Sequence, residues 1–135
     1  GFIYDTEPSA RAVVAMRSHS PERALSFMNR IQRAFYAENR DITDIEVLAE
    51  LALEFGLTRA EFLADMASDT IRNETLSDFM VAQRTGVTGF PTLIAGTGGS
   101  TGWALITEGF QPKERILALL ERWHSQMTVK PQARP

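Results

Sequence analysis

Cysteine is absent from the 135 residues of this sequence, so no disulfide can form within it and no thiol is available for redox or metal chemistry. A basic excess is absent as well, because the net charge is −3 and the arginines are scattered among acidic residues. Nucleic acid and anionic membrane surfaces are therefore not expected partners. No apolar run approaches the ~20 residues of a membrane-spanning helix.

Residues 1–15 lack the basic start and long apolar centre of a signal peptide. This absence says nothing about targeting if the natural protein begins upstream, and the missing cysteine does not identify the compartment either. We leave the compartment open, with the cytoplasm favoured over the periplasm. The 44% hydrophobic composition over 135 residues is sufficient for the core of one domain.

The first third of the chain predicts two helices. Thr6 as N-cap and Pro8 in the first turn predict a helix through about Ser18. A second start signal follows at residues 20–22. From Ala24 apolar residues recur at three- and four-residue steps, which predicts a buried helix face through about Glu38. That face consists of Leu25, Met28, Ile31 and Phe35.

Two capping boxes predict the next helix starts, Thr43 with Glu46 and Thr58 with Glu61. Gly56 is expected to end the first of these helices in a left-handed conformation. Ser68-Asp69-Thr70 predicts the start of a longer helix that ends at Gly86. Its inward residues should be Ile71, Leu76, Phe79 and Met80.

The last third predicts an antiparallel hairpin followed by a helix. The strands are expected around Leu93-Ile94 and over 103–107, and the turn over 96–100. A helix from Pro112 should bury Ile116, Leu119, Leu120 and Trp123. Because a two-stranded hairpin is marginal by itself, its apolar faces require further strands or a helix layer.

The segment 86–95 contains a proline that opens an apolar strand. Proline has no N–H for a sheet ladder, so it is confined to strand starts, edges and bulges. Gly86 and Gly89 precede it, together with the aromatic residue Phe90. We interpret this pattern as a backbone feature in which residue 90 presents unpaired main-chain groups to a ligand.

Several motifs, in this order and spacing, resemble the DsbA-like branch of the thioredoxin-like superfamily. They are Tyr4-Asp5-Thr6-Glu7-Pro8, the segment 34–44, Gly86-Val87-Thr88-Gly89-Phe90-Pro91-Thr92, and Gly109-Phe110-Gln111-Pro112. The resemblance implies an α/β thioredoxin-like fold of DsbA type with a large helical insert, of which this chain holds mostly helices and one β-hairpin. It implies a helical insert over 1–85, the cis-proline loop, hairpin and closing helix over 86–127, and a loose tail over 128–135.

The resemblance also implies an activity, thiol–disulfide exchange by an oxidoreductase or isomerase. Pro91 would be the cis proline, Phe90 the residue that pairs with an extended substrate, and Gly89 its neighbour in the binding loop. The family's Cys-x-x-Cys and first strands would precede residue 1. This chain would then hold no catalytic residue and be redox-inactive by itself. Without the resemblance, a trans proline that starts an edge strand, with Phe90 in the core, is the simpler interpretation.

Two further interpretations stay open. Related DsbA-like proteins with a serine in place of the first cysteine bind glutathione and act as isomerases or transferases. The third interpretation is a peptide-binding module that keeps the proline loop without a nucleophile. The expected partners are accordingly protein or peptide thiols and disulfides, or glutathione. No cofactor is expected besides glutathione, and the oligomeric state is left open.

Other candidate sites are weaker. The glycine-rich segment 96–100 lacks the lysine and the helix start of a phosphate loop. Neither His19, expected in a polar loop, nor His124, expected on a helix surface, shows a sign of activating Ser9 as a nucleophile. No cluster has metal-ligand spacing.

Two groups of side chains have both a structural and a functional interpretation. Glu46, Glu50 and Glu54 share one helix face, which we expect to be solvated and not a cation site. Phe35, Tyr36, Phe79 and Trp103 either pack in the core or line a substrate groove. Tyr36 is the best candidate for a groove, because its hydroxyl needs a polar partner.

Overall fold

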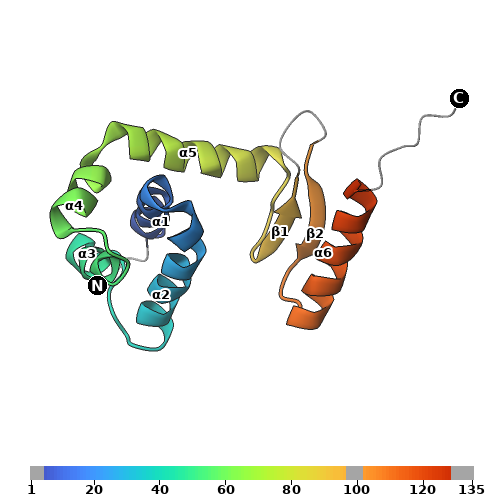
Figure 1. Cartoon of the computed structure of the whole chain (residues 1–135), viewed down its shortest axis with the longest axis horizontal. Helices are drawn as coiled ribbons and strands as arrows, with labels where there is room; N and C mark the ends of the chain where they lie inside the picture. The colour runs from blue at the N-terminus through green and yellow to red at the C-terminus, as the bar shows by residue number, and fades with distance from the viewer. Residues whose placement is uncertain (1–4, 97–101, 129–135) are drawn as a thin grey trace, which may run out of the picture. The chain divides into compact units, whose positions relative to one another are not determined.

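The computed structural model describes residues 5–96 and 102–128 (Figure 1). Two compact units divide the chain, a helical unit of Gly1–Met80 and a sheet unit of Val81–Pro135. The elements in chain order are α1 (Glu7–His19), η1 (Pro21–Arg23), α2 (Ala24–Tyr36), α3 (Ile45–Leu53), α4 (Arg59–Ala67), α5 (Asp69–Arg84), β1 (Thr92–Ala95), β2 (Ala104–Glu108) and α6 (Lys113–Thr128).

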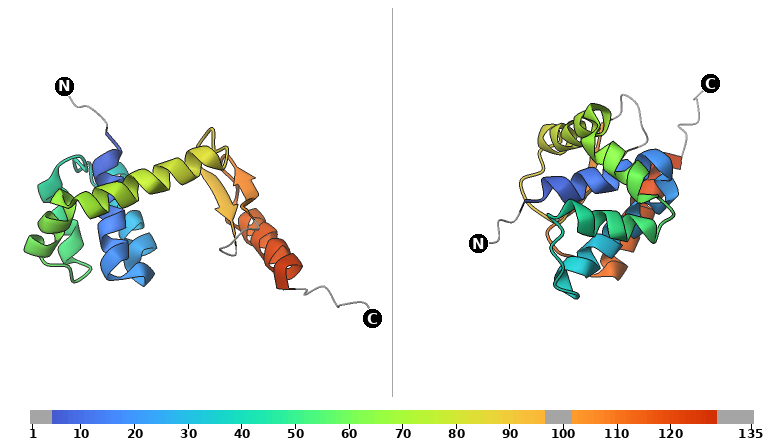
Figure 2. Two further views of the ribbon diagram at one scale, coloured as in Figure 1. Left: turned by 90° about the horizontal axis from the view of Figure 1, so that it is seen from above. Right: turned by 90° about the vertical axis from the view of Figure 1, so that its left-hand side faces the viewer.

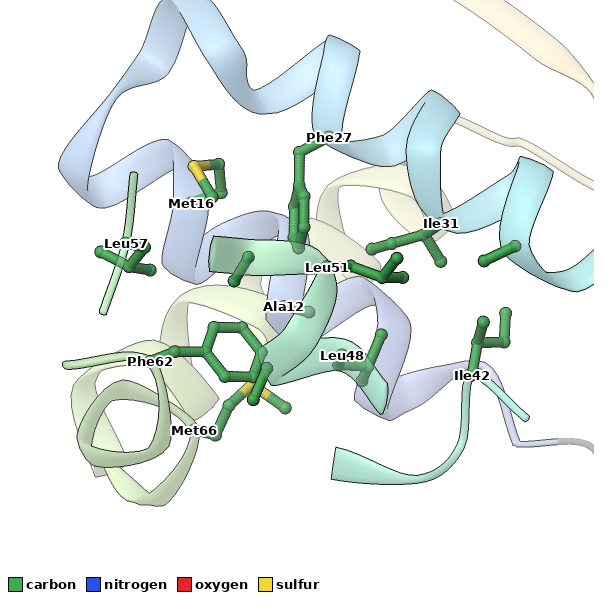
Figure 3. Close-up of a cluster of buried hydrophobic side chains, with 13 residues drawn as sticks. Ala12, Met16, Phe27, Ile31, Ile42, Leu48, Leu51, Leu57, Phe62 and Met66 are labelled. Atoms are coloured by element: carbon green, nitrogen blue, oxygen red, sulfur yellow. The ribbon is translucent and has the colours of Figure 1, made fainter. Parts of the chain in front are cut away.

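The core of the helical unit lies where α1, α2, α3 and α4 meet (Figure 3). Phe27 and Ile31 of α2 face Leu48 and Leu51 of α3 in this cluster. Met16, from α1, and Phe62 and Met66, from α4, belong to the same cluster. Four short amphipathic helices that bury one another's apolar faces therefore supply the hydrophobic stabilisation of this unit.

The predicted face of α2 is wrong by about one residue. The buried face consists of Ala24, Phe27, Ile31 and Ala34. Leu25 is 74% exposed, and Met28 is exposed as well. The two alanines contribute little to a hydrophobic pattern, but their small side chains let α1 and α3 approach α2 closely. Packing therefore selected a face that the larger apolar residues did not indicate.

Local hydrogen bonds set the helix starts. The capping box of Thr58 and Glu61 is confirmed, since each side chain accepts the main-chain N–H of the other residue. The box predicted at Thr43 is wrong, because Asp44 is the N-cap and accepts the N–H of Glu46 at 2.9 Å. Thr43 instead donates to Asp41, which forms the preceding turn.

Two further predictions concern the start of α1 and the end of α3, and the structure confirms the second in full and the first in part. Thr6 is the N-cap of α1, but its side chain makes no capping hydrogen bond. The N–H of Glu7 donates to Asp5 Oδ1 at 2.9 Å instead. Gly56 has a φ of +82°, the left-handed conformation predicted for it.

α5 buries less than the sequence predicts. Ile71 is buried as expected, and Thr75 is buried with its hydroxyl donating to the Ile71 carbonyl at 2.8 Å. Leu76, Phe79 and Met80, predicted to face inward, are exposed. The reason is that only the first two turns of α5 contribute side chains to a buried cluster, in which Ile71 contacts residues of α1.

The sheet unit contains the predicted antiparallel hairpin. Thr92 is opposite Glu108 and Leu93 is opposite Thr107, and the register then shifts so that Ile94 is opposite Leu105. The shift leaves Ile106 as an extra residue of β2, a β-bulge. Residues 97–100 of the predicted turn lie outside the described residues.

α6 packs beside this hairpin (Figure 2). It starts at Lys113, directly after Pro112, and the four apolar residues predicted to face the sheet are half-buried. The predicted loose tail lies, apart from Thr128, outside the described residues. The sheet unit thus has one helix layer on a two-stranded hairpin, and the other elements of the described chain are helices, as expected for the C-terminal elements and helical insert that the resemblance implies.

Candidate substrate-binding loop

The loop between α5 and β1 begins with a defined helix end. Gly86 adopts a φ of +77° and donates its N–H to the Gln83 carbonyl, while Val87 donates to the Ala82 carbonyl. Glycine tolerates this conformation because it has no Cβ. The chain then leaves the helix axis and enters the segment Thr88–Pro91.

The peptide bond between Phe90 and Pro91 is cis, which confirms the isomer that the resemblance implied. Hydrogen bonds hold the loop on both sides of this bond. Thr92 Oγ1 donates to the Gly89 carbonyl at 2.7 Å, and the Gly109 N–H donates to the Pro91 carbonyl at 2.8 Å. The loop is therefore attached both to β1 and to the residue that follows β2.

Phe90 is the most accessible large hydrophobic residue among those that the structure describes. Its side chain is 87% exposed. Within residues 5–96 and 102–128, neither its main-chain N–H nor its carbonyl makes a hydrogen bond. The alternative of a trans proline with Phe90 in the core is therefore wrong. Whether Gly89, Phe90 and Pro91 bind a substrate stays a prediction.

Phe110 is a second exposed aromatic residue of this region that the sequence interpretation did not single out. It follows Gly109, which donates to Pro91, and it is 84% exposed. In the sequence analysis Phe110 belongs to the motif 109–112, which was used only for the family resemblance and the start of the last helix. Exposure is a tertiary property, so no pattern of sequence distinguishes this phenylalanine from one that packs under α6.

The other candidate residues have structural partners. The Ser9 hydroxyl donates to the Ile42 carbonyl at 3.1 Å. His19 is the last residue of α1 and not a loop residue, and its Nε2 lies 2.7 Å from Asp65 Oδ2 of α4. His124 is exposed on α6, as predicted.

The three glutamates of α3 and its C-cap are exposed, as predicted, but each has an arginine partner. Glu46 contacts Arg59 at 2.7 Å, Glu54 contacts Arg30 at 2.8 Å, and Glu50 contacts Arg40. The hydrogen bond from Arg30 lowers the pKa of Glu54 below its ordinary value. These pairs neutralise the face, so it has no free carboxylate charge for a cation.

Neither a metal cluster nor a membrane span occurs in the part of the chain that the structure describes. Over residues 5–96 and 102–128, no three histidine, aspartate or glutamate side chains gather as metal ligands would. In the same ranges each helix is too short or too polar to cross a bilayer.

Two of the four aromatic residues considered for a groove do line one. Phe35 and Tyr36 border a cavity of about 330 Å³ within the helical unit. Phe79 and Trp103 do not line this cavity, and both are exposed. Core packing is therefore the wrong interpretation for Tyr36, Phe79 and Trp103, whereas Phe35 is half-buried.

The fold, the cis-proline loop and the order of the motifs agree with the result of a comparison with protein families. The family model described as thioredoxin matches residues 8–117, so this chain belongs to the thioredoxin family. Within that family its similarity is to DsbA-like proteins.

The solved structures that match include proteins named for disulfide chemistry. A "putative protein disulfide isomerase" from Nitrosomonas europaea is 38% identical, with a TM-score of 0.87 over 93% of this chain and 61% of that chain. The cytosolic disulfide reductase DsbM from Pseudomonas aeruginosa is 27% identical, with a TM-score of 0.73 over 91% of this chain and 61% of that one.

DsbM has also been solved with GSH. That structure is 26% identical to this chain, with a TM-score of 0.71 over 90% of this chain and 60% of the other. In all three comparisons the present chain spans about three fifths of the length of the matched protein.

Proposed function

We propose that this chain forms the substrate-side part of a thiol–disulfide oxidoreductase or isomerase whose reactive thiols lie outside residues 1–135. The chain contains no cysteine, so an exchanging thiol has to come from other polypeptide. In the exchange, a thiolate attacks one sulfur of the substrate disulfide and the other substrate sulfur leaves as a thiolate. A second enzyme thiol then displaces the substrate from the mixed disulfide, and the enzyme pair is oxidised as the substrate is reduced.

The observation that carries this proposal is the free main chain of Phe90. Its N–H and carbonyl make no hydrogen bond within the described residues, and its side chain projects into solvent. An extended peptide can pair with such groups as an added strand, which gives affinity without dependence on the peptide's sequence. A disulfide reductase or isomerase needs this property, because its substrates share a disulfide and not a sequence motif.

The first test concerns the gene upstream of the codon for Gly1. The proposal predicts an in-frame Cys-x-x-Cys, and the longer product should reduce insulin. In that product Phe90→Pro removes the main-chain donor and Phe90→Ala removes only the side chain. Because one hydrogen bond contributes about 1 kcal/mol, we expect Phe90→Pro to lower kcat/KM about five- to tenfold. Full activity of a folded Phe90→Pro variant would contradict the pairing role.

A glutathione-dependent isomerase or transferase is the second candidate. The observation that favours it is the similarity to DsbM, which has been solved with GSH. A serine in place of the first cysteine of the upstream segment would support this candidate. The longer product should then bind glutathione in a calorimeter and leave insulin unreduced.

A peptide-binding module without a nucleophile is the third candidate. It is favoured by the absence of cysteine from residues 1–135 together with the exposed Phe90 loop. A complete gene product without any cysteine, and with affinity for extended peptides, would support it. Insulin reduction by that product would eliminate it.

A further inference from the structure

The helical unit contains a cavity of about 330 Å³ between α1 and α2. Side chains of α1 form one wall and side chains of α2 form the other. The apolar part of these walls consists of Ala10, Val13, Val14, Met28, Phe35 and Tyr36. All lining residues lie between Ser9 and Asp78, so the cavity belongs to the helical unit alone.

Buried residues line one part of the cavity, and residues of α2 line its exposed entrance. The buried lining residues are Val14, Ile42 and Thr75. Met28, Gln32, Phe35 and Tyr36 recur at helical spacing, one stripe away from the buried face of α2. These four α2 side chains therefore lie beside the core. The cavity between them and α1 stays open because the α1 residues Ser9 and Ala10 are small.

The two charged side chains that line the cavity form an ion pair, so their charges neutralise each other. Arg17 Nη1 of α1 donates to Asp78 Oδ2 of α5 at 2.7 Å. Among the residues that the structure describes, no other charged side chain lines the cavity. A charged ligand would lose its hydration without gaining a free counter-ion, which is unfavourable. The lining therefore selects against both anions and cations.

Two polar side chains at the entrance are available to a ligand. The Gln32 amide and the Tyr36 hydroxyl make no hydrogen bond within the described ranges 5–96 and 102–128. By contrast, the Ser9 and Thr75 hydroxyls already donate to the carbonyls of Ile42 and Ile71. A ligand can thus be hydrogen-bonded at the α2 side and must be apolar elsewhere.

We propose that this cavity binds a neutral small molecule with one apolar ring and one hydrogen-bonding group. The volume lies at the lower end of the range for ligand sites, which suits a single ring system and not a larger cofactor. The ring would lie against Val13, Val14 and Phe35, and its polar group would contact Gln32 or Tyr36. None of the lining residues belongs to the loop of Gly89, Phe90 and Pro91, so the ligand test has a readout of its own and can fail without affecting the proposed function.

The test titrates ¹⁵N-labelled full chain with p-cresol and follows the amide shifts by NMR. We expect shifts confined to the residues that line the cavity, with a dissociation constant of about 1 mM for so small a probe. The charged probes 4-methylbenzoate and 4-methylbenzylamine have the same ring and should bind at least tenfold more weakly. Equal binding of either charged probe would overturn the proposal.

Two variants and their matched controls locate the site. Val13→Phe fills the cavity and should abolish the p-cresol shifts, whereas Val81→Phe, at an exposed position outside it, should not. Gln32→Leu should weaken p-cresol severalfold but leave toluene unaffected, and Gln83→Leu should change neither. Unchanged p-cresol binding in both folded cavity variants would overturn the proposal. So would shifts at the cavity with a phenylalanine-containing peptide but none with p-cresol.

Discussion

The helical unit and the sheet unit differ sharply in how much of their apolar surface they bury. Every buried hydrophobic residue among those that the structure describes lies in the helical unit. In the described part of the sheet unit, Thr107 is the one buried residue, and large apolar side chains such as Phe90 and Phe110 are exposed. The helical unit therefore has a core of its own, and the sheet unit has an apolar surface without one.

The difference follows from the geometry of the two kinds of element. Four helices can each bury one stripe against the others and close a core. A two-stranded sheet has two faces, and α6 covers only one of them within the described residues. The lesson is that the buried hydrophobic core of this chain lies in the helical unit, whereas the hairpin of the sheet unit leaves most of its large apolar side chains exposed.

The most severe way to break this comparison is to separate the units. We expect residues 1–80 to unfold cooperatively on heating, because their core is complete. Residues 81–135 should show no cooperative transition, since a hairpin with one helix buries too little surface to fold alone. Circular dichroism of the two fragments against temperature measures this. A sharp transition in the second fragment would show that the sheet unit needs no further polypeptide.

A matched pair of substitutions compares the two units within the intact chain. Phe62 is fully buried in the helical core and Phe90 is exposed in the sheet unit. Phe62→Ala should lower the free energy of unfolding by about 3–5 kcal/mol, through lost burial and the cavity left behind. Phe90→Ala should change it by less than about 0.5 kcal/mol. Urea unfolding measures both, and similar costs would refute the assignment of the core.

The capping box of α4 should have a smaller effect. Thr58→Ala removes the acceptor for the Glu61 N–H and should cost about 1 kcal/mol of the free energy of unfolding. Thr58→Ser keeps the hydroxyl and should recover most of this loss. At Thr6, whose side chain makes no capping hydrogen bond, the alanine variant should cost much less, and the serine variant should recover nothing. Chemical denaturation of the four variants provides the check.

The smallest expected effect is the pH dependence of the Arg30–Glu54 pair. Because the pKa of Glu54 is lowered in the folded chain, the pair stabilises the fold at neutral pH. This contribution disappears as the pH falls through the folded-state pKa and the carboxylate becomes protonated. Arg30→Ala should cost about 0.5–1 kcal/mol at pH 7 and much less at pH 3.

Arg33→Ala is the control for this pair. Arg33 contacts Glu38 but not Glu54, and it is far more exposed than Arg30. We expect its cost to be within error at both pH values in urea titrations. Arg30 contacts both Glu38 and Glu54, whereas Arg33 contacts Glu38. An equal loss of unfolding free energy for the two alanine variants at pH 7 would mean that the contact of Arg30 with Glu54 contributes nothing.

Sequence reasoning succeeded where the signal is local. The box at Thr58, the left-handed Gly56, the helix end at Gly86 and the antiparallel hairpin all depend on residues a few positions apart. The free main chain of residue 90 was predicted from the pattern of glycine and proline around it, whereas the cis bond to Pro91 was implied by the resemblance. The substrate-binding role of that loop is still a prediction.

The errors occurred where contacts join distant parts of the chain. Ala24 and Ala34 are buried while Leu25 is exposed, because helix packing rewards close approach as well as hydrophobicity. The contact of His19 with Asp65 joins residues 46 positions apart, so no local pattern indicates it. The same is true of the pair between Arg17 and Asp78 at the cavity.

The amino-acid sequence by itself indicated most of the helix starts, the left-handed helix end at Gly56 and the antiparallel hairpin, because those depend on short-range hydrogen bonds and backbone conformations. It also excluded thiol chemistry within the chain, since cysteine is absent. Only the tertiary structure decided which helix faces are buried, which acidic side chains are paired, and where a cavity is left. These properties depend on the distances between elements, which the packing of the whole core sets.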